Sequence, residues 1–538
     1  MQTTATQRRT LLPTAIRWHR RLAWMAGIAA ILWALTGMTH PLMVWTMPQP
    51  ATRFVPPVPL DLTGALPPAE VLGRAGLTQA AEVRATAALG RPLYAARPDG
   101  AGERRWFDPM TGEEVAGEDR RRAEALARLY AGEATAPVRD LRLVTAFDAE
   151  YPAVNALLPV WRVVFDRQDS LTAFVDTGGE RLGTLTDDRK RVIQWIFRNI
   201  HTLAFLEGRT EPLRVLLITL LVGSVLATVL AGVVQLLRLR RPKRPPGLRG
   251  LHRIGGWVVA VPALMLTISG LWQLLHSAIP ADQPRLPPQR IATADLTAPL
   301  GSTWAALTEG RKVTGLAVVV AEGTPLLRLE LPPPRPGQPP AADAAPAPAA
   351  PAPAPADPHA HHGHGSGHEG GHEGHGATTA APGPGAAAPD RTAFFRGQPQ
   401  SGAAILADGA TGQALDLTDS GLALRLASTA LGRPLPADTP VTLVTRFSDE
   451  YGFLNKRLPV WRILPAGEDG PRLFIDTEEA VVAAHVTGAD LLRDQVFDLL
   501  HKWRFLDGLG QVPRDIILMV FAALLAGAGT VGILLRRR

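Results

Sequence analysis

The stretch WHRRLAWMAGIAAILWALTG at residues 18–37 decides the fold, because it is a basic flank followed directly by a long apolar run. The charge-free run continues to residue 45, and about 20 helical residues are enough to cross a hydrocarbon core of roughly 30 Å. Three more charge-free apolar runs of similar length occur at residues 215–237, 254–275 and 516–535. We therefore expect an integral membrane protein with a four-helix transmembrane bundle.

The basic residues predict how this bundle is oriented. Arginines cluster before the first run, between the second and third runs, and at the C-terminus. The positive-inside rule places all three clusters in the cytoplasm, and membrane flanks explain the net charge of +7 without a nucleic-acid partner. The chain has no cysteine, which excludes disulfides, iron–sulfur clusters and covalent attachment of c-type haem. We expect a bacterial inner-membrane protein in contact with lipid, with both termini cytoplasmic.

These signals divide the chain into alternating membrane and exterior segments. Short runs of alternating polarity, such as VWRVVF at 160–165, predict strands, so we expect the exterior regions to be α+β and periplasmic. In chain order we expect a cytoplasmic N-terminus (1–17), a first span (18–46), a periplasmic region (47–212), a second span (213–237), a basic cytoplasmic linker (238–251), a third span (252–276), a second periplasmic region (277–513), and a fourth span with the basic C-terminus (514–538).

The two halves of the chain repeat one another in the same orientation. The sequence VTAFDAEYPAVNALLPVWR at 144–162 returns, at an offset of 300, as VTRFSDEYGFLNKRLPVWR at 444–462. At an offset of 233, the opening stretch aligns with LHRIGGWVVAVPALMLTISG at 251–270. Two parallel repeats predict a pseudo-twofold axis along the membrane normal, with function at the interface between the halves.

Residues 332–389 form an insertion rich in Pro, Ala, Gly and His, which cannot bury a core. Aligning the halves places this insertion in a hairpin whose first-half counterpart has only the short turn 97–104. Imidazole suits Ni, Cu, Zn and Co, so the insertion could bind a divalent transition metal, and a flexible loop with incidental affinity is the alternative. Its candidate metal ligands are His359, His361, His362, His364, His368, His372 and His375.

Six other histidines lie at the ends of the spans, and four of them form strict pairs under the repeat. Amphipathic rings suit the membrane interface, which is the alternative explanation for any one of them. Zinc would usually recruit carboxylate or thiolate ligands, which the spans lack, whereas haem b takes two axial imidazoles from two helices. We therefore expect two or more haem b groups, with ligands drawn from His19 and His252, His201 and His501, and His40 and His276.

The two H-R spans, His19 to Gly37 and His252 to Gly270, resemble the PepSY-associated transmembrane helix family. The P-V-W-R strands at 159–162 and 459–462 resemble the PepSY domains that accompany it. The resemblance implies two α+β PepSY-like periplasmic domains, and it implies that the span-end histidines are haem ligands. Members are often described as iron-regulated inner-membrane proteins, and some resemble haem-b reductases that act on ferric siderophores.

We therefore favour a transmembrane haem-b oxidoreductase that passes electrons to a periplasmic metal complex, such as a ferric siderophore. No dinucleotide-binding motif is present, so the electron donor would be a quinol or a separate redox protein. The alternative is a non-enzymatic PepSY-type protein that handles metal or regulates another protein, with Ni, Cu, Zn or Co bound on the histidine loop. Arg162 and Arg462 could contact an anionic ligand or pair with carboxylates such as Asp176 and Asp476.

Overall fold

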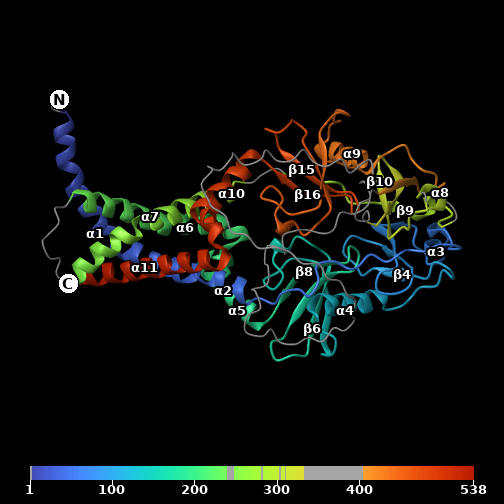
Figure 1. The fold of residues 1–538 in the computed structure, drawn as a ribbon, viewed down its shortest axis with the longest axis horizontal. Helices are drawn as coiled ribbons and strands as arrows, with labels where there is room; N and C mark the ends of the chain where they lie inside the picture. Colours follow the sequence, from blue (N-terminus) through green and yellow to red (C-terminus); the bar gives the residue numbers. More distant parts are fainter. Residues whose placement is uncertain are drawn as a thin grey trace, which may run out of the picture.

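A computed structural model describes residues 3–238, 247–279, 283–301, 304–308, 310–332 and 404–537. The molecule is elongated, with a helical bundle at one end and a group of β-sheets at the other (Figure 1). We call the sheet-bearing part, residues 47–210 and the described residues of 283–332 and 404–510, the sheet module. Both chain termini lie at the end of the bundle farthest from the sheets, here called the basic end, and the opposite end is the module end.

Four helices form the bundle, and each contains a segment long and apolar enough to cross a membrane. They are α1 (Thr3–Gly37), α6 (Glu211–Arg238), α7 (Gly247–Ser277) and α11 (Gln511–Arg537). Helix α1 packs on α6 and α11, and α7 packs on the same two helices, so α1 and α7 lie on opposite corners. Four long apolar helices are thus present where four spans were predicted, although the first is broken at Met38 and continues as α2 (Thr39–Thr46).

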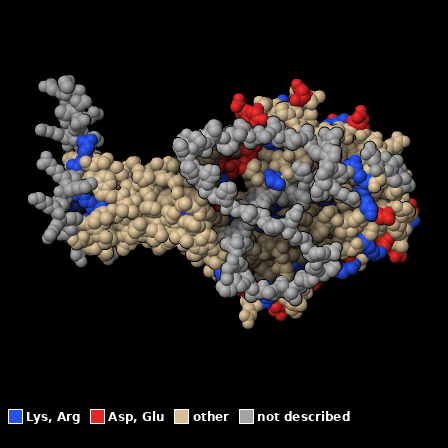
Figure 2. Space-filling view, viewed as in Figure 1, with Lys and Arg blue, Asp and Glu red and all other residues tan. Residues whose placement is uncertain are grey.

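The outer surface of the bundle is apolar. Large side chains such as Leu216, Leu220 and Val520 are about half exposed although they belong to the most hydrophobic helices. Figure 2 shows that the bundle surface carries almost no charged residues between the sheet module and the basic end, where Lys and Arg gather. This distribution is typical of helices that face lipid and end in a basic flank.

The two halves of the chain share a central six-stranded antiparallel sheet. Its strand order is β12-β11-β10-β2-β3-β4, and β2 pairs with β10 across the repeat boundary with Arg84 opposite Ala317. These two residues are equivalent at the offset of 233, so the pseudo-twofold axis passes through their pair. The strands are β2 (Glu82–Thr86), β3 (Leu93–Arg97), β4 (Arg105–Phe107), β10 (Gly315–Ala321), β11 (Thr324–Glu330) and β12 (Ile405–Asp408).

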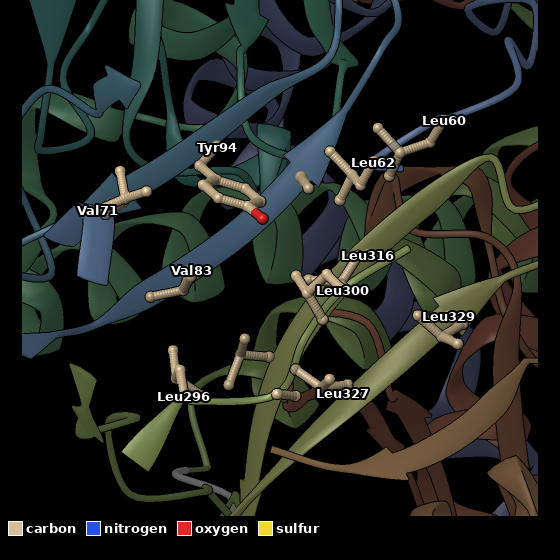
Figure 3. Close-up of a cluster of buried hydrophobic side chains, with 14 of the residues drawn as sticks. Leu60, Leu62, Val71, Val83, Tyr94, Leu296, Leu300, Leu316, Leu327 and Leu329 are labelled. Atoms are coloured by element: carbon tan, nitrogen blue, oxygen red, sulfur yellow. The ribbon is translucent and has the colours of Figure 1, made fainter. Parts of the chain in front are cut away.

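Apolar side chains from both halves fill one core on this sheet. Figure 3 shows Val83 and Tyr94 of the first half in the same cluster as Leu316, Leu327 and Leu329 of the second. All five are nearly inaccessible to solvent, and burying side chains of this size stabilises a fold by about 1.5–3 kcal/mol each. The two expected exterior regions are therefore one joined body. Short elements border this sheet: α3 (Pro68–Arg74), β1 (Gln79–Ala80), β9 (Ile291–Ala292) and α8 (Trp304–Leu307).

Each half also has its own four-stranded antiparallel sheet, covered by one amphipathic helix. Helix α4 (Glu118–Ala131) buries Ala123, Leu126, Ala127 and Tyr130, a spacing that places all four on one face. The helix of the second half is α9 (Asp419–Leu431). The strands are β5 (Val138–Val144), β6 (Val160–Phe165), β7 (Thr172–Asp176) and β8 (Arg181–Thr186), then β13 (Val441–Val444), β14 (Val460–Ile463), β15 (Arg472–Asp476) and β16 (Val481–Val486).

A buried aspartate ties each of these helices to its sheet. Asp119 accepts hydrogen bonds from Trp106 Nε1 (3.0 Å), Trp161 Nε1 (2.7 Å) and Thr177 Oγ1 (2.7 Å). Its repeat equivalent Asp419 accepts from the corresponding Trp and Thr and from Arg328. The Trp of each P-V-W-R motif therefore has a structural role, because its indole N–H links the strand to the buried aspartate of the covering helix.

The arginine of the same motif binds carboxylates other than those we expected. Arg162 pairs with Glu150 (2.8 Å) and Asp140 (2.6 Å), and Arg462 pairs with Glu450 (2.9 Å). The expected partners Asp176 and Asp476 instead pair with Arg104, which directly precedes β4, and with Arg181 of the strand 181–186. Alternation along the strand explains the difference, because Trp161 points into the core and the next residue points outward.

The insertion separates two strands that still pair in the register of the first half. Tyr94 faces Phe107 in the β3–β4 hairpin, and the equivalent residues Leu327 and Ala407 face each other in β11–β12. Strands β11 and β12 therefore pair antiparallel as β3 and β4 do. The histidine tract itself, from His359 to His375, lies outside the described residues.

Candidate cofactor site

Two histidine rings meet inside the bundle near the basic end. His19 of α1 and His252 of α7 have ring centroids 6.1 Å apart and planes inclined by 57°. The two helices occupy opposite corners of the bundle, so the rings approach each other across its centre. The two histidines are equivalent at the offset of 233, and in the structure their rings face each other.

Hydrogen bonding determines which nitrogen of His19 is available. Its Nδ1–H donates to the carbonyl oxygen of Thr228 at 2.9 Å, which leaves the lone pair of Nε2 free. His252 Nδ1 is buried without a hydrogen bond of normal geometry, although the carbonyl of Ala528, the equivalent of Thr228, still interacts with its ring. Both rings are therefore oriented by a backbone carbonyl on the adjacent helix, with a weaker restraint at His252.

Glycines leave room for both rings. A Cβ atom on Gly232 would lie 3.4 Å from Cε1 of His19, and one on Gly532 would lie 3.2 Å from Cε1 of His252. The two glycines are equivalent at the offset of 300, on α6 and α11. Each histidine is thus flanked by a position where a larger residue would displace the ring.

A second symmetric set of histidines lies at the module end. His201 ends a π-helical turn (Phe197–His201) after α5 (Asp188–Ile196), and His501 follows α10 (Gly488–Leu500). Their Nδ1 atoms lie 3.0 Å from the hydroxyls of Thr36 and Ser269, respectively. Thr36 and Ser269 are equivalent residues of the two repeated spans, at the offset of 233.

The hydroxyls fix the tautomer of both rings. Thr36 donates its only hydroxyl proton to the carbonyl of Leu32 at 2.7 Å, and Ser269 donates its proton to the carbonyl of Met265 at 2.7 Å. Each hydroxyl can then only accept from the histidine, so Nδ1 of His201 and His501 carries the proton. The lone pair of Nε2 is free in both rings, as it is in His19, and this is the state in which imidazole binds a metal.

Both module-end rings are also kept neutral. Burial lowers the pKa of His201 to about 3, with smaller effects from His501 and His40, and burial lowers the pKa of His501 to about 4. Each ring stacks on a phenylalanine one helical turn earlier, Phe197 at 4.8 Å and Phe497 at 4.5 Å between centroids. Both rings are therefore neutral and fixed in orientation, and a phenylalanine packs against one face of each ring.

The remaining two span-end histidines do not share this arrangement. His40 is exposed and lies 5.6 Å from the ring of Phe197, and the residue equivalent to it in the other repeat is Gln273. His276 points its Nε2 toward Asp490 at 3.7 Å. The structure therefore brings together four of the six predicted ligands as two symmetric sets. His40 lies beside the module-end set, against the phenylalanine that stacks on His201, whereas His276 faces a carboxylate.

The two sets are separated along the bundle. Thr36, the partner of His201, follows His19 by seventeen residues in the continuous helix α1, which corresponds to about 26 Å. Within the described ranges, no group of three or more His, Asp or Glu is arranged to hold a metal ion directly. Comparisons with protein-family models and with curated proteins find no match to this chain.

Proposed function

We propose that this chain is a transmembrane haem-b oxidoreductase that moves electrons along the bundle from the basic end to the module end. The observation that carries the proposal is the symmetric set of oriented imidazoles with free Nε2 atoms. Facing histidines on two helices are the usual axial ligands of a haem in a helical bundle. An interfacial anchoring role alone would not require a fixed tautomer in equivalent residues of both repeats.

The residues present fit such a group. His19 and His252 would hold one haem near the basic end, because their rings face each other with centroids 6.1 Å apart and the Nε2 lone pair of His19 is free. His201 and His501 are the ligand candidates at the module end, where Thr36 and Ser269 hold their rings. A bound haem b would supply one-electron redox chemistry.

The expected direction of transfer follows from orientation and from the PepSY resemblance. We infer that the basic end is cytoplasmic and the sheet module periplasmic, in a bacterial inner membrane. The acceptor would then be a periplasmic metal complex, such as a ferric siderophore, and the donor a quinol or a separate redox protein. The sheet module would cover the module-end histidines as a PepSY-like pair of domains.

Visible spectroscopy tests this proposal directly. Protein purified in detergent from haem-replete cells should show sharp α and Soret bands after reduction with dithionite. His252→Ala should lower the haem content, whereas deletion of residues 340–388 should leave the haem content unchanged. A wild-type protein that shows no α and Soret bands would contradict the proposal.

A non-enzymatic role in metal handling is the second candidate, and the seven histidines between residues 359 and 375 favour it. In that case the full chain would bind Ni, Cu, Zn or Co, and the deletion of 340–388 would abolish this binding. The purified protein would show no haem spectrum. The same two preparations therefore distinguish the two functions.

A further inference from the structure

Two short helices beside the bundle carry large apolar side chains that they do not bury. Helices α5 and α10 lie where the bundle meets the sheet module, on opposite sides of the junction (Figure 1). Val192 and Trp195 of α5 are 60% and 61% exposed. On α10, Leu492, which is equivalent to Val192 at the offset of 300, and Leu499 are 50% and 52% exposed. Spacings of three and seven residues place each pair on one face of its helix, so both repeats present an exposed apolar face here.

The turn after each helix exposes a phenylalanine in the same way. Phe205 and Phe505 are equivalent residues, and both are more than half exposed. Each comes two residues after a non-glycine residue with a positive φ angle, Leu203 at 51° and Trp503 at 53°. This backbone conformation is uncommon for residues that have a side chain. The chain therefore turns identically in both halves, and both turns leave the aromatic ring outside.

Contacts with α7 give the height of α10 along the bundle. At the start of α10, Asp490 lies 3.7 Å from Nε2 of His276, and just after its end His501 meets the hydroxyl of Ser269 at 3.0 Å. The two contact residues of α7 are seven positions apart, which corresponds to about 10 Å. Helix α10 therefore runs alongside the last two turns of α7 toward the basic end. Helix α5 packs on α2, which continues the first span.

These last turns of α7 belong to the apolar outer surface of the bundle. Ile268, Trp272 and Leu275 are all partly exposed there. Helix α7 has 31 residues and a length of about 46 Å, so it is long enough to reach from one headgroup region to the other. The apolar face of α10 lies at the height of these three residues and continues the surface that they form.

The polar sides of the same segments hold the sheet module. Arg191 of α5 donates to Thr172 Oγ1 of β7 at 3.2 Å. Arg504, which follows α10, pairs with Asp449 at 2.8 Å. Amphipathic helices at a membrane lie with their apolar face at the boundary between headgroups and acyl chains, and tryptophan is enriched at this level. The two segments thus have the arrangement expected of helices between a membrane and an attached domain.

We propose that α5 and α10, each with the turn that follows it, insert their apolar faces into the outer leaflet and attach the sheet module to phospholipid. Lipid is the occupant because the exposed faces continue the apolar surface of the bundle. The proposal rests on the bundle crossing a membrane, and it does not depend on haem. It also fixes the height of His201 and His501, because these residues end the two attached segments.

The chain has no cysteine, so single cysteines can be introduced and spin-labelled in the full-length protein. In vesicles of phosphatidylethanolamine and phosphatidylglycerol, power saturation compares collisions of the label with oxygen, which enriches in lipid, and with nickel–EDDA, which stays in water. Leu216→Cys on the bundle is the lipid reference, and Met110→Cys, in the turn after β4, is the water reference; both side chains are about half exposed. We expect Val192→Cys, Phe205→Cys and Phe505→Cys to give oxygen-to-nickel ratios close to the lipid reference.

The ratio should also rise along α10, from Leu492→Cys to Leu499→Cys, because Leu499 lies nearer the contact with Ser269. Five positions are labelled one at a time, so a variant that fails to fold leaves the others to decide. Ratios equal to that of Met110→Cys would overturn the proposal. It would also be overturned if neither reagent reached the labels and dipolar distances joined two copies, since a second chain would then cover the surface. Labels that become accessible only after deletion of residues 340–388 would assign the surface to the insertion and overturn it as well.

The reduced haem spectrum of the wild type is recorded in the same vesicles. A haem-containing protein whose labels face water contradicts the membrane attachment alone. Labels in lipid on a protein without haem contradict the haem proposal alone.

Discussion

At the scale of single residues, the most informative atoms are the hydroxyl oxygens of Thr36 and Ser269. Each hydroxyl donates its proton to a backbone carbonyl one turn earlier and accepts a hydrogen bond from the Nδ1–H of a histidine in another segment. A hydroxyl used in this way selects one tautomer and one ring orientation. In the proposed haem site this hydroxyl would orient the ligand, and losing such a hydrogen bond typically costs 10–100-fold in metal affinity.

Ser269→Ala should therefore weaken haem binding at the module end by about 10–100-fold. Haem content per protein, read from the reduced α-band during titration with haem, measures the effect. Ser277→Ala is the control, because Ser277 lies on the same helix and its hydroxyl donates to the carbonyl of Leu274. Equal loss in both variants would show that the Ser269 hydroxyl does not orient the ligand.

The repeat in the sequence was enough to predict His19 with His252 and His201 with His501 as equivalent ligands. It also contained Thr36 and Ser269, in the T-G and S-G pairs that end each span, but nothing in the sequence indicated that they touch the histidines. Those contacts join residues far apart in the chain, Thr36 to His201 and Ser269 to His501. Long-range packing of this kind is decided by how helices are arranged, which local patterns do not encode.

A second prediction at this scale concerns Asp119. Its buried carboxylate accepts hydrogen bonds from the indole N–H groups of Trp106 and Trp161. Asp119→Ala would leave these donors without partners, so we expect the sheet module to lose about 3–5 kcal/mol of stability. The thermal midpoint of tryptophan fluorescence should fall by several degrees. Glu103→Ala, which removes a surface pair with Arg120, should change stability by less than about 1 kcal/mol.

At the scale of elements, α6 and α11 shape the basic-end site through glycine. Gly232 and Gly532 hold no side chain against the histidine rings, and they occupy equivalent positions. The sequence alone did not identify them, because α6 contains two glycines and α11 three, and one sequence does not show which residues of neighbouring helices face each other. A helix interior normally disfavours glycine by about 1 kcal/mol relative to alanine, so a close neighbour explains its presence.

Gly532→Leu should push the His252 ring out of its position and lower the haem content at the basic end. Gly527→Leu is the matched control on the same helix, because a Cβ atom there would meet nothing within 4 Å. The ratio of haem to protein in purified samples gives the comparison. If the two leucine variants keep the same haem content as the wild type, the glycine does not make room for a ligand.

At the scale of the whole molecule, a charged network crosses the interface between the halves. Arg84 pairs with Glu82 at 3.0 Å and with Glu478, and Arg181 pairs with Glu478 at 3.1 Å. Burial raises the pKa of Glu330 to about 7 and that of Glu180 to about 6 at the same interface. The shared six-stranded sheet was not predicted, since the sequence indicated two separate exterior domains and β2 pairs with β10 across more than two hundred residues.

These raised pKa values predict that Glu180 and Glu330 contribute less to stability as pH rises. A group with a folded pKa above its unfolded value of 4.5 stabilises the fold fully below that value, and its contribution is lost as pH rises through about 7. The thermal midpoint of the wild type should therefore fall relative to that of Glu330→Gln between pH 5 and pH 8, while His201 and His501, whose pKa values are lowered by burial, act in the opposite direction below about pH 6.5 in both proteins. Glu330→Gln, which mimics the protonated form, should flatten this dependence, and Glu103→Gln should not. Glu82, whose pKa is lowered to about 2, keeps its charge throughout this range.

The hairpins of the central sheet tolerate very different connections. Tyr94 faces Phe107 across a turn of residues 98–104, and Leu327 faces Ala407 although residues 331–404 intervene. The pairing of strands thus does not depend on what joins them. A reporter such as a fluorescent protein, spliced into the exposed turn at Asp99–Gly100, should therefore leave both the sheet and the membrane bundle intact. The molecule carries a ready attachment point for following its folding, its orientation and its traffic in living cells.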